Sequence, residues 1–400
     1  MANLLYLVHR LPYPPNKGDK VRSFHLMKHL ARRHRLYLGS FIDDPADAVH
    51  LDAVRAHCAD MHIARLSPRA AKLRSLSGLL SGEALSLPYY RNAALRAWVA
   101  RTCAAVPIDA AVVFSSVMAD YVPDMARLPT LVDFVDMDSA KWRQYATAHR
   151  WPLSWLYRRE GERLLAFERA VASRARRSFF VTEAEAGLFR GAAPECAGRV
   201  DAMCNGVDAE FFSPAHGGAS PFAADEIPVV FTGAMDYWPN IDAAVWFAGE
   251  ILPRLRERHP AVRFTIVGRS PDPAVQALAG EGVRVTGTVD DVRPYIAHAA
   301  VVVAPLRIAR GIQNKVLEAM AMARPVVASA ACAGPIAATL GEELLAAENV
   351  DDYVAAIEAL LADRVRADVI GQAARRRVLE SYSWDAHLGA IDHLLEEIPA

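Results

Sequence analysis

Gly311, Lys315 and Glu318 have the types and the spacing of residues that could bind a phosphorylated ligand. They lie within residues 301–329, where the apolar pattern predicts a strand, a glycine turn, a helix from about Gln313 and a second strand. A glycine lets the backbone approach a ligand closely, and the start of a helix offers unpaired N–H groups and the positive end of the helix dipole. Such a helix start readily binds phosphate.

Lys315 and Glu318 would then contact different parts of one ligand. A lysine in the first turn opposes the helix dipole, so we expect it to meet an anion. Glu318 lies three residues further along the same helical face. A diphosphate held by Gly311, the following amides and Lys315 would leave Glu318 free to accept hydrogen bonds from ribose hydroxyls. The alternative is an ordinary crossover with a Lys–Glu pair on its surface, and these residues alone do not decide between the two.

The segment NKVLEAMAMARPVV, residues 314–327, resembles the donor-binding segment of family 4 glycosyltransferases, which are retaining enzymes of the GT-B fold. That family usually carries E-x7-E here, followed by a proline that ends the helix. Glu318 matches the second glutamate and Pro325 matches the exit, but Arg310 stands where the first glutamate would be. Any role of that glutamate must be absent or replaced, and Arg310 could instead pair with a donor phosphate through its planar fork.

The resemblance extends over nearly the whole chain. The proline-rich loop before Gly18 resembles the family's glycine loop, and residues 205–214 resemble its passage between domains. The loop that begins at Gly233 lacks the family's Arg/Lys pair, so we prefer Arg269, which follows a predicted strand, as the substitute phosphate partner. The predicted donor-binding residues are Gly18, Gly233, Arg269, Gly311, Ile312, Gln313, Asn314, Lys315 and Glu318, with Thr288 and Val289 beside the base. Asp236 and Asn240 are further polar candidates that helix capping explains equally well.

Asp136 and Asp138 directly follow a predicted strand, residues 130–135. D-x-D is the metal-binding signature of GT-A glycosyltransferases, but this pair is far in sequence from the turn at Gly311. We therefore expect a metal-free GT-B site with no cofactor, in which Asp136 or Asp138 positions an acceptor hydroxyl and Arg310 acts on the donor. Helix capping by Asp138 is the alternative.

Alternating strand and helix patterns predict an α/β protein with two Rossmann-like, doubly wound domains, which the resemblance implies face a cleft. At 400 residues, with 53% hydrophobic and 23% charged residues, the chain is long enough for two cores. We expect an acceptor-binding domain over residues 1–208, a linker over 209–226 and a donor-binding domain over 227–381. A final helix over 382–400 is expected to pack back on the first domain.

The net charge of −1 hides an uneven distribution. Residues 1–208 hold 29 Lys and Arg against 21 Asp and Glu, or 29 − 21 = +8, and the remainder holds 16 against 25, or −9. Residues 64–80 alternate basic residues with leucines, and residues 151–159 add Trp and Tyr beside arginines. Both segments could lie on an anionic membrane, or they are solvated helices on the core. No apolar run is long enough to span a membrane, and five scattered cysteines fit a reducing cytosol.

Within family 4, the form R-G-I-Q-N-K-V-L-E-A-M-A-M at residues 310–322 resembles the sugar transferases of PEP-CTERM/exosortase exopolysaccharide loci. The implied reaction moves a hexose from a nucleotide diphosphate sugar to a saccharide acceptor, lipid-linked in this reading, with retention at the anomeric carbon. The expected location is cytoplasmic or peripheral on the inner membrane face, without a nucleic-acid partner. A nucleotide-sugar epimerase and a non-catalytic saccharide- or partner-binding protein remain alternatives.

Overall fold

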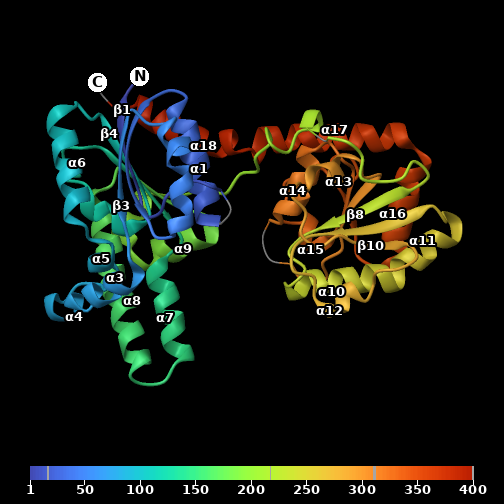
Figure 1. Ribbon diagram of the computed structural model, residues 1–400, viewed down its shortest axis with the longest axis horizontal. Coiled ribbons are helices and arrows are strands. Elements are labelled where there is room, and N and C mark those ends of the chain that lie inside the picture. The colour runs from blue at the N-terminus through green and yellow to red at the C-terminus, as the bar shows by residue number, and fades with distance from the viewer. Residues whose placement is uncertain (16–17, 217, 310–311, 399–400) are drawn as a thin grey trace. The chain divides into compact units, whose positions relative to one another are not determined.

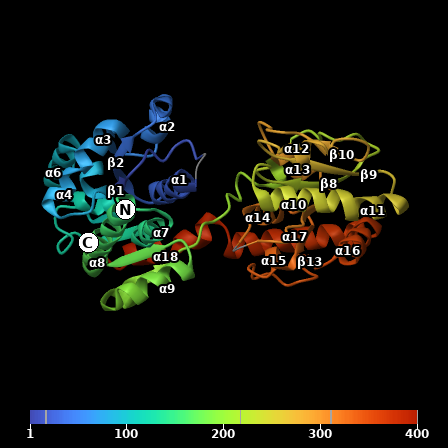
Figure 2. The ribbon, with the colours of Figure 1, turned by 90° about the horizontal axis from the view of Figure 1, so that it is seen from below.

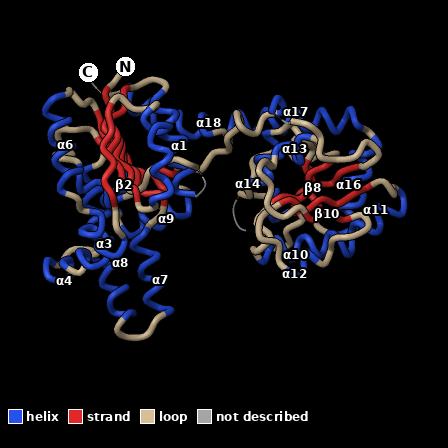
Figure 3. Tube along the Cα trace, in the orientation of Figure 1, coloured by secondary structure: helices blue, strands red, loops and turns tan. Residues whose placement is uncertain are grey.

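The computed structural model describes residues 1–15, 18–216, 218–309 and 312–398. It divides the chain into two compact units, the first being Met1–Asn205 with His387–Ala400 and the second Gly206–Ala386. Each unit is built on one parallel sheet, and Figure 3 shows the strands as two separate groups. The predicted α/β architecture with two doubly wound halves is therefore confirmed.

The sheet of the first unit has the order β3-β2-β1-β4-β5-β6-β7. Its strands are nearly continuous apolar runs, because a parallel sheet is covered by helices on both faces. The order reverses between β1 and β4, and ligands of such folds bind at the carboxyl ends of the strands at this switch point. The strands are β1 (Asn3–Val8), β2 (Arg35–Ile42), β3 (Asp60–Arg65), β4 (Ala110–Phe114), β5 (Thr130–Val135), β6 (Arg177–Phe180) and β7 (Val200–Ala202).

Helix α6 lies along one face of this sheet and α1 along the other, while α7 and α8 form a pair that extends beyond it (Figures 1 and 2). The helices are α1 (Gly18–Ala31), α2 (Leu51–Arg55), α3 (Pro68–Ser75), α4 (Ser77–Ser81), α5 (Ser86–Tyr90), α6 (Ala93–Ala105), α7 (Asp138–Ala148), α8 (Leu153–Arg174) and α9 (Glu183–Ala192). The final helix, α18 (Trp384–Glu396), returns to the first unit, where Asp392 bonds His29 of α1 at 3.1 Å. This return matches the predicted fold.

The second unit has the order β10-β9-β8-β11-β12-β13, with its switch point between β8 and β11. Helices α10 and α11 lie on one face of the sheet and α14 and α17 on the other (Figure 1). The strands are β8 (Ile227–Thr232), β9 (Val262–Val267), β10 (Val283–Val285), β11 (Val301–Ala304), β12 (Val326–Ser329) and β13 (Leu345–Ala347). The helices are α10 (Trp238–Trp246), α11 (Leu252–Arg258), α12 (Pro273–Gln276), α13 (Arg293–Ala297), α14 (Asn314–Ala321), α15 (Ala330–Ala333), α16 (Val350–Ala362) and α17 (Arg364–Ser381).

Helix α15 begins at Ala330, because the side chain of Ser329 accepts a hydrogen bond from the Cys332 amide at 3.3 Å. Strand β3 was not predicted, since Asp60 and His62 interrupt its apolar pattern. Among the described residues, no helix is both long and apolar enough to cross a membrane.

Candidate functional site

A cavity of about 640 Å³ lies at the carboxyl edge of the second sheet, at its switch point. It collects residues that follow β8 and β9 together with the start of α14, which follows β11. The predicted residues that line it are Gly233, Arg269, Ile312, Gln313, Asn314, Lys315 and Glu318, joined by Asn240, Thr288 and Val289. Asp236 does not line it, and Gly18 begins α1 in the other unit. Arg310 and Gly311 lie outside the described residues.

Two glycines allow the ends of β8 and β9 to meet beneath this cavity. A Cβ at Gly268 would lie 1.6 Å from the carbonyl oxygen of Gly233, which no side chain tolerates. The Gly233 amide donates to the Val267 carbonyl at 3.0 Å. A Cβ at Gly233 would lie 3.0 Å from the Lys315 Nζ, so this glycine leaves the space that the amine occupies. Gly233 therefore lies beside the start of α14, at the edge of the cavity.

Lys315 is a half-buried cation whose amine donates to the Asn240 Oδ1 at 2.5 Å. The Asn240 amide is held in place because its Nδ2 donates to the Ala234 carbonyl at 2.8 Å. The amine also lies 4.8 Å from the centre of the Phe231 ring. Burial lowers the pKa of Lys315 to about 8, and the nearby Glu318 opposes this only in part. An anion in the cavity would stabilise the charged amine.

These contacts decide two alternatives left open by the sequence. Lys315 donates to Asn240, so the two residues of the motif do not form a simple Lys–Glu pair on the surface. Asn240 does not cap a helix either, because it lies inside α10, whose N-cap is Tyr237. The amide of Asn240 instead orients the lysine.

Glu318 reaches the same cavity one turn along α14 from Lys315. Burial raises the pKa of this carboxyl to about 7, and the charge of Lys315 opposes the shift. An ionised carboxylate is only an acceptor, so it suits a hydroxyl-rich ligand such as a ribose.

Arg269 and Tyr237 form the exposed rim of the cavity. The backbone of Arg269 is fixed, since its carbonyl accepts from the Met235 amide at 2.9 Å, and among the described residues no side chain bonds its guanidinium, which could meet an anion. Tyr237 is 59% exposed and was not identified from the sequence. The sequence feature that could have identified Tyr237 is an aromatic residue in the loop after β8, where a flat ring could stack on a base.

A second cavity, of about 460 Å³, lies at the switch point of the first unit. His9 follows β1, Ser115 follows β4 and Asp138 begins α7, so all three come from the carboxyl edge of this sheet. Four aromatic side chains complete much of the lining: Tyr89, Tyr90, Trp142 and Tyr157. Such rings and polar groups suit a sugar, whose faces are apolar and whose rim is hydroxylated.

The two predicted acidic residues behave differently. Asp138 lines this cavity, and burial raises the pKa of its carboxyl. Asp136 does not line the cavity, although both carboxylates bind the Lys141 amine, at 2.7 Å and 3.3 Å. The capping alternative for Asp138 is wrong, because the N-cap of α7 is Met137 and no side chain caps it. Glu168, deeply buried, instead accepts from the Ser139 amide at 3.3 Å.

His9 is the residue of this cavity that sequence reasoning missed. Its Nδ1 is buried and has no hydrogen-bond partner among the described residues, while its Nε2 lies 3.5 Å from Asp19. The backbone is strained nearby, with φ of 74° at Ser115 and 68° at Val135. Non-glycine residues rarely adopt positive φ, and such strain clusters at functional sites. The sequence feature that could have identified His9 is its position directly after a predicted strand.

Metal binding is not supported by any cluster in the described part of the chain, where no three His, Cys, Asp or Glu side chains come together as ligands.

Comparison with known proteins agrees with this geometry. Residues 226–363 match the model of the family described as glycosyl transferases group 1. Among solved structures, the chain resembles Anabaena HepE in complex with UDP, at 17% identity and a TM-score of 0.60, covering 98% of this chain and 99% of that one. Sucrose-phosphate synthase from Thermosynechococcus elongatus is 19% identical with a TM-score of 0.60, and the match covers 99% of this chain and 98% of that one. A glycosyltransferase from Rickettsia africae is 13% identical with a TM-score of 0.63, and the match covers 99% of this chain and 98% of that one.

A sequence search of curated proteins found no match. The structural likenesses show the GT-B fold, and the match to the group 1 family model is confined to residues 226–363.

Proposed function

We propose that the protein is a retaining glycosyltransferase that moves a hexose from a nucleotide diphosphate sugar to a saccharide acceptor. The observation that carries the proposal is Lys315, a desolvated cation beside Glu318 at the start of a helix, in a cavity at the switch point. Solved GT-B structures with a similar fold include HepE in complex with UDP and with UDP-glucose, which supports the same ligand class.

The transfer requires the nucleoside diphosphate to leave with its negative charge stabilised. Lys315 and Arg269 would neutralise the diphosphate, joined by Arg310 from the preceding loop, and the first amides of α14 would donate to its oxygens. Glu318 would accept from the ribose hydroxyls, and Thr288 and Val289 would border the base. These groups supply the charge that a metal ion provides in other transferases, so we propose a metal-independent reaction.

A thermal-shift panel of UDP, GDP, ADP, TDP and their common sugars tests the proposed donor site. A ligand at a hundred times its dissociation constant adds about 2.7 kcal/mol of stability. We expect one base to raise the melting temperature of the wild type, and Glu318→Ala to lose most of this shift because the ribose loses its acceptor. Arg254→Ala, an exposed change in the same unit, is the matched control. No shift with any nucleotide would contradict the proposal and favour a non-catalytic protein.

The cavity of the first unit supports a proposal for the acceptor. Asp138 and His9 are polar groups beside aromatic rings, and one of them would position the acceptor hydroxyl, with Asp136 close by in sequence. We propose a saccharide linked to a membrane lipid, in exopolysaccharide synthesis of the type found at PEP-CTERM/exosortase loci.

The lipid part of this proposal rests on one surface of the first unit, which we call the basic apolar surface. It comprises α3, α4, Trp151 and the start of α8, and Figure 1 shows these helices at the lower end of the first unit. Residues 61–82 and 139–159 contain no acidic residue. Leu80 is 93% exposed and Trp151 is 80% exposed. Exposed tryptophan and leucine among basic residues are typical of surfaces that lie on anionic membranes.

A hydrogen bond joins two of the helices of this surface. Arg159 of α8 donates to the Gly78 carbonyl of α4 at 2.7 Å. Trp155 lies one helical turn before Arg159 and is 54% exposed. Lys72 of α3 and Tyr157 of α8 also line the cavity of the first unit. A lipid-linked saccharide could therefore enter this cavity from the membrane.

Vesicle flotation tests the surface independently of the transferase reaction. We expect binding to vesicles that contain phosphatidylglycerol but not to pure phosphatidylcholine, and weaker binding at high salt because each basic residue near the surface contributes about 1 kcal/mol. The triple variant Leu80→Ser, Trp151→Ser, Trp155→Ser should lower the partition coefficient at least about tenfold. Trp238→Ser, at an exposed tryptophan of the other unit, is the control. If the triple variant binds as tightly as the wild type, the assigned surface is wrong.

A further inference from the structure

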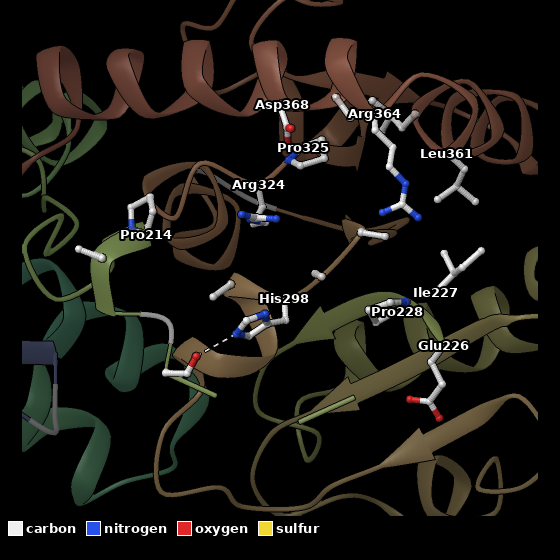
Figure 4. Close-up of a pocket in the computed structure, with 17 residues that line it drawn as sticks. Pro214, Glu226, Ile227, Pro228, His298, Arg324, Pro325, Leu361, Arg364 and Asp368 are labelled. Carbon is white, nitrogen blue, oxygen red and sulfur yellow. Dashed lines mark hydrogen bonds between the residues drawn. The ribbon is translucent and has the colours of Figure 1, made fainter. Parts of the chain in front are cut away.

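A third cavity, of about 560 Å³, opens at the opposite edge of the second sheet, where β8, β11 and β12 begin (Figure 4). Its volume is that of an ordinary small-molecule site, for which about 300–1,000 Å³ is typical. None of its lining residues belongs to the cavity that holds Lys315. A ligand here would therefore be a different one from the proposed donor.

Arg324 is the residue of this cavity that lacks a partner. It lies between α14 and β12, and its Nε is buried with no hydrogen-bond partner among the described residues. Burial lowers the pKa of its guanidinium, and the field of Asp368 opposes the shift. A buried donor without an acceptor is rare and costly, so it calls for an explanation. Because Arg324 lines the cavity, an oxyanion there could accept hydrogen bonds from its guanidinium.

Arg364 offers a second guanidinium to the same space. It begins α17, is exposed, and in Figure 4 its head turns from that helix toward the strands. Of the lining carboxylates, Glu226 is already bound by Arg284, at 2.9 Å and 3.1 Å. Asp368 is then the one lining carboxylate that opposes the two arginines, Arg324 and Arg364. The net charge of these three groups is 2 − 1 = +1. The balance favours an anion.

The rest of the lining is mostly apolar. It consists of Pro214, Ala215, Ile227, Pro228, Ala297, Ala299, Ala300, Pro325, Leu360, Leu361 and Ala367, together with Gly218 and His298. His298 does not add a free donor at its Nε2, because that atom lies 2.9 Å from the Gly218 carbonyl (Figure 4). These aliphatic residues can pack against the body of a ligand, although polar atoms supply the larger part of the cavity's surface.

The two arginines are held in fixed relation by the packing of α17. A Cβ at Gly371 of α17 would lie 2.2 Å from the carbonyl oxygen of Ala323, directly before Arg324. This close approach fixes the backbone of α17, on which Arg364 lies two turns earlier, against the segment that carries Arg324. The site is therefore built on rigid elements.

We propose that this cavity binds a small phosphate or carboxylate carried on an apolar body, with Arg324 and Arg364 holding the oxyanion. The planar fork of arginine suits both kinds of oxyanion. The inference does not depend on the function proposed for the donor cavity.

Calorimetric titration with phenyl phosphate, benzoate and inorganic phosphate tests the site. The full chain carries Lys315→Ala, which removes the lysine of the donor cavity as a competing phosphate partner. We expect the better of the two aromatic anions, phenyl phosphate or benzoate, to bind at one site. Its affinity should be higher than that of inorganic phosphate. Arg324→Gln and Arg364→Gln should each weaken binding at least about tenfold, as for a lost charge-assisted hydrogen bond.

Two further variants make the test specific. Asp368→Asn should strengthen binding, because it removes the only unneutralised carboxylate that lines the cavity. Arg366→Gln is the matched control, since this exposed arginine of α17 does not line the cavity. If neither aromatic anion binds, or if binding ignores both Arg324→Gln and Arg364→Gln, the proposal is overturned.

Discussion

Replacing Lys315 with alanine is expected to lower kcat/KM for sugar transfer by about 10²- to 10³-fold, the usual effect of deleting one group that stabilises developing charge. The amine is half-buried and burial lowers its pKa to about 8, so keeping it charged costs the free protein stability that its bond to Asn240 offsets only in part. The melting temperature without ligand should therefore stay the same or rise, while the shift produced by the nucleoside diphosphate disappears.

The pH dependence of donor affinity provides the control for this interpretation. A bound diphosphate raises the pKa of Lys315, so above about pH 8 the free protein must take up a proton on binding. We expect the affinity of the wild type to fall as pH rises through that value, by up to about tenfold per unit, and the slope to vanish in Lys315→Ala. An equal slope in both proteins would show that another group carries the charge.

Gly268→Ala is expected to destabilise the second unit by about 3 kcal/mol or more, because overpacking against backbone cannot relax by moving a side chain. The added methyl would lie 1.6 Å from the Gly233 carbonyl oxygen. The ends of β8 and β9 must separate to admit it, and the cavity beside Gly233 is then lost. Denaturant unfolding and nucleotide binding should both report the change.

Gly249→Ala is the matched substitution, since a Cβ at this position meets no atom within 4 Å. We expect it to leave stability and nucleotide binding close to those of the wild type. If Gly268→Ala unfolds at the same denaturant concentration as Gly249→Ala, the close approach of the two strand ends does not exist in solution.

Much of the second unit's site follows from the sequence because its residues are local to one strand–turn–helix unit. The strand at 301–304, the helix from about Gln313 and the strand at 326–329 all form as predicted. Gly233 and Arg269 were also placed correctly at the cavity, since each follows a predicted strand and parallel strands end at one edge of a sheet.

The remaining features depend on contacts between distant segments, which periodicity does not encode. The bond from Lys315 to Asn240 joins residues 75 apart, and it alone distinguishes an oriented cation from a surface pair. His9 and Asp138 meet at one cavity although β1 and β5 are far apart in the chain. The sequence does not reveal the Nε of Arg324, which has no hydrogen-bond partner among the described residues, because its burial depends on the packing of α17 against α14 and Ala323.

A crystal structure of the protein with the nucleoside diphosphate that gives the largest thermal shift would test the central claim most directly. The account predicts that the diphosphate lies at the start of α14 within hydrogen-bond distance of the Lys315 amine, and that the ribose hydroxyls meet the Glu318 carboxylate. A nucleotide bound elsewhere, with the cavity beside Gly233 empty, would contradict it.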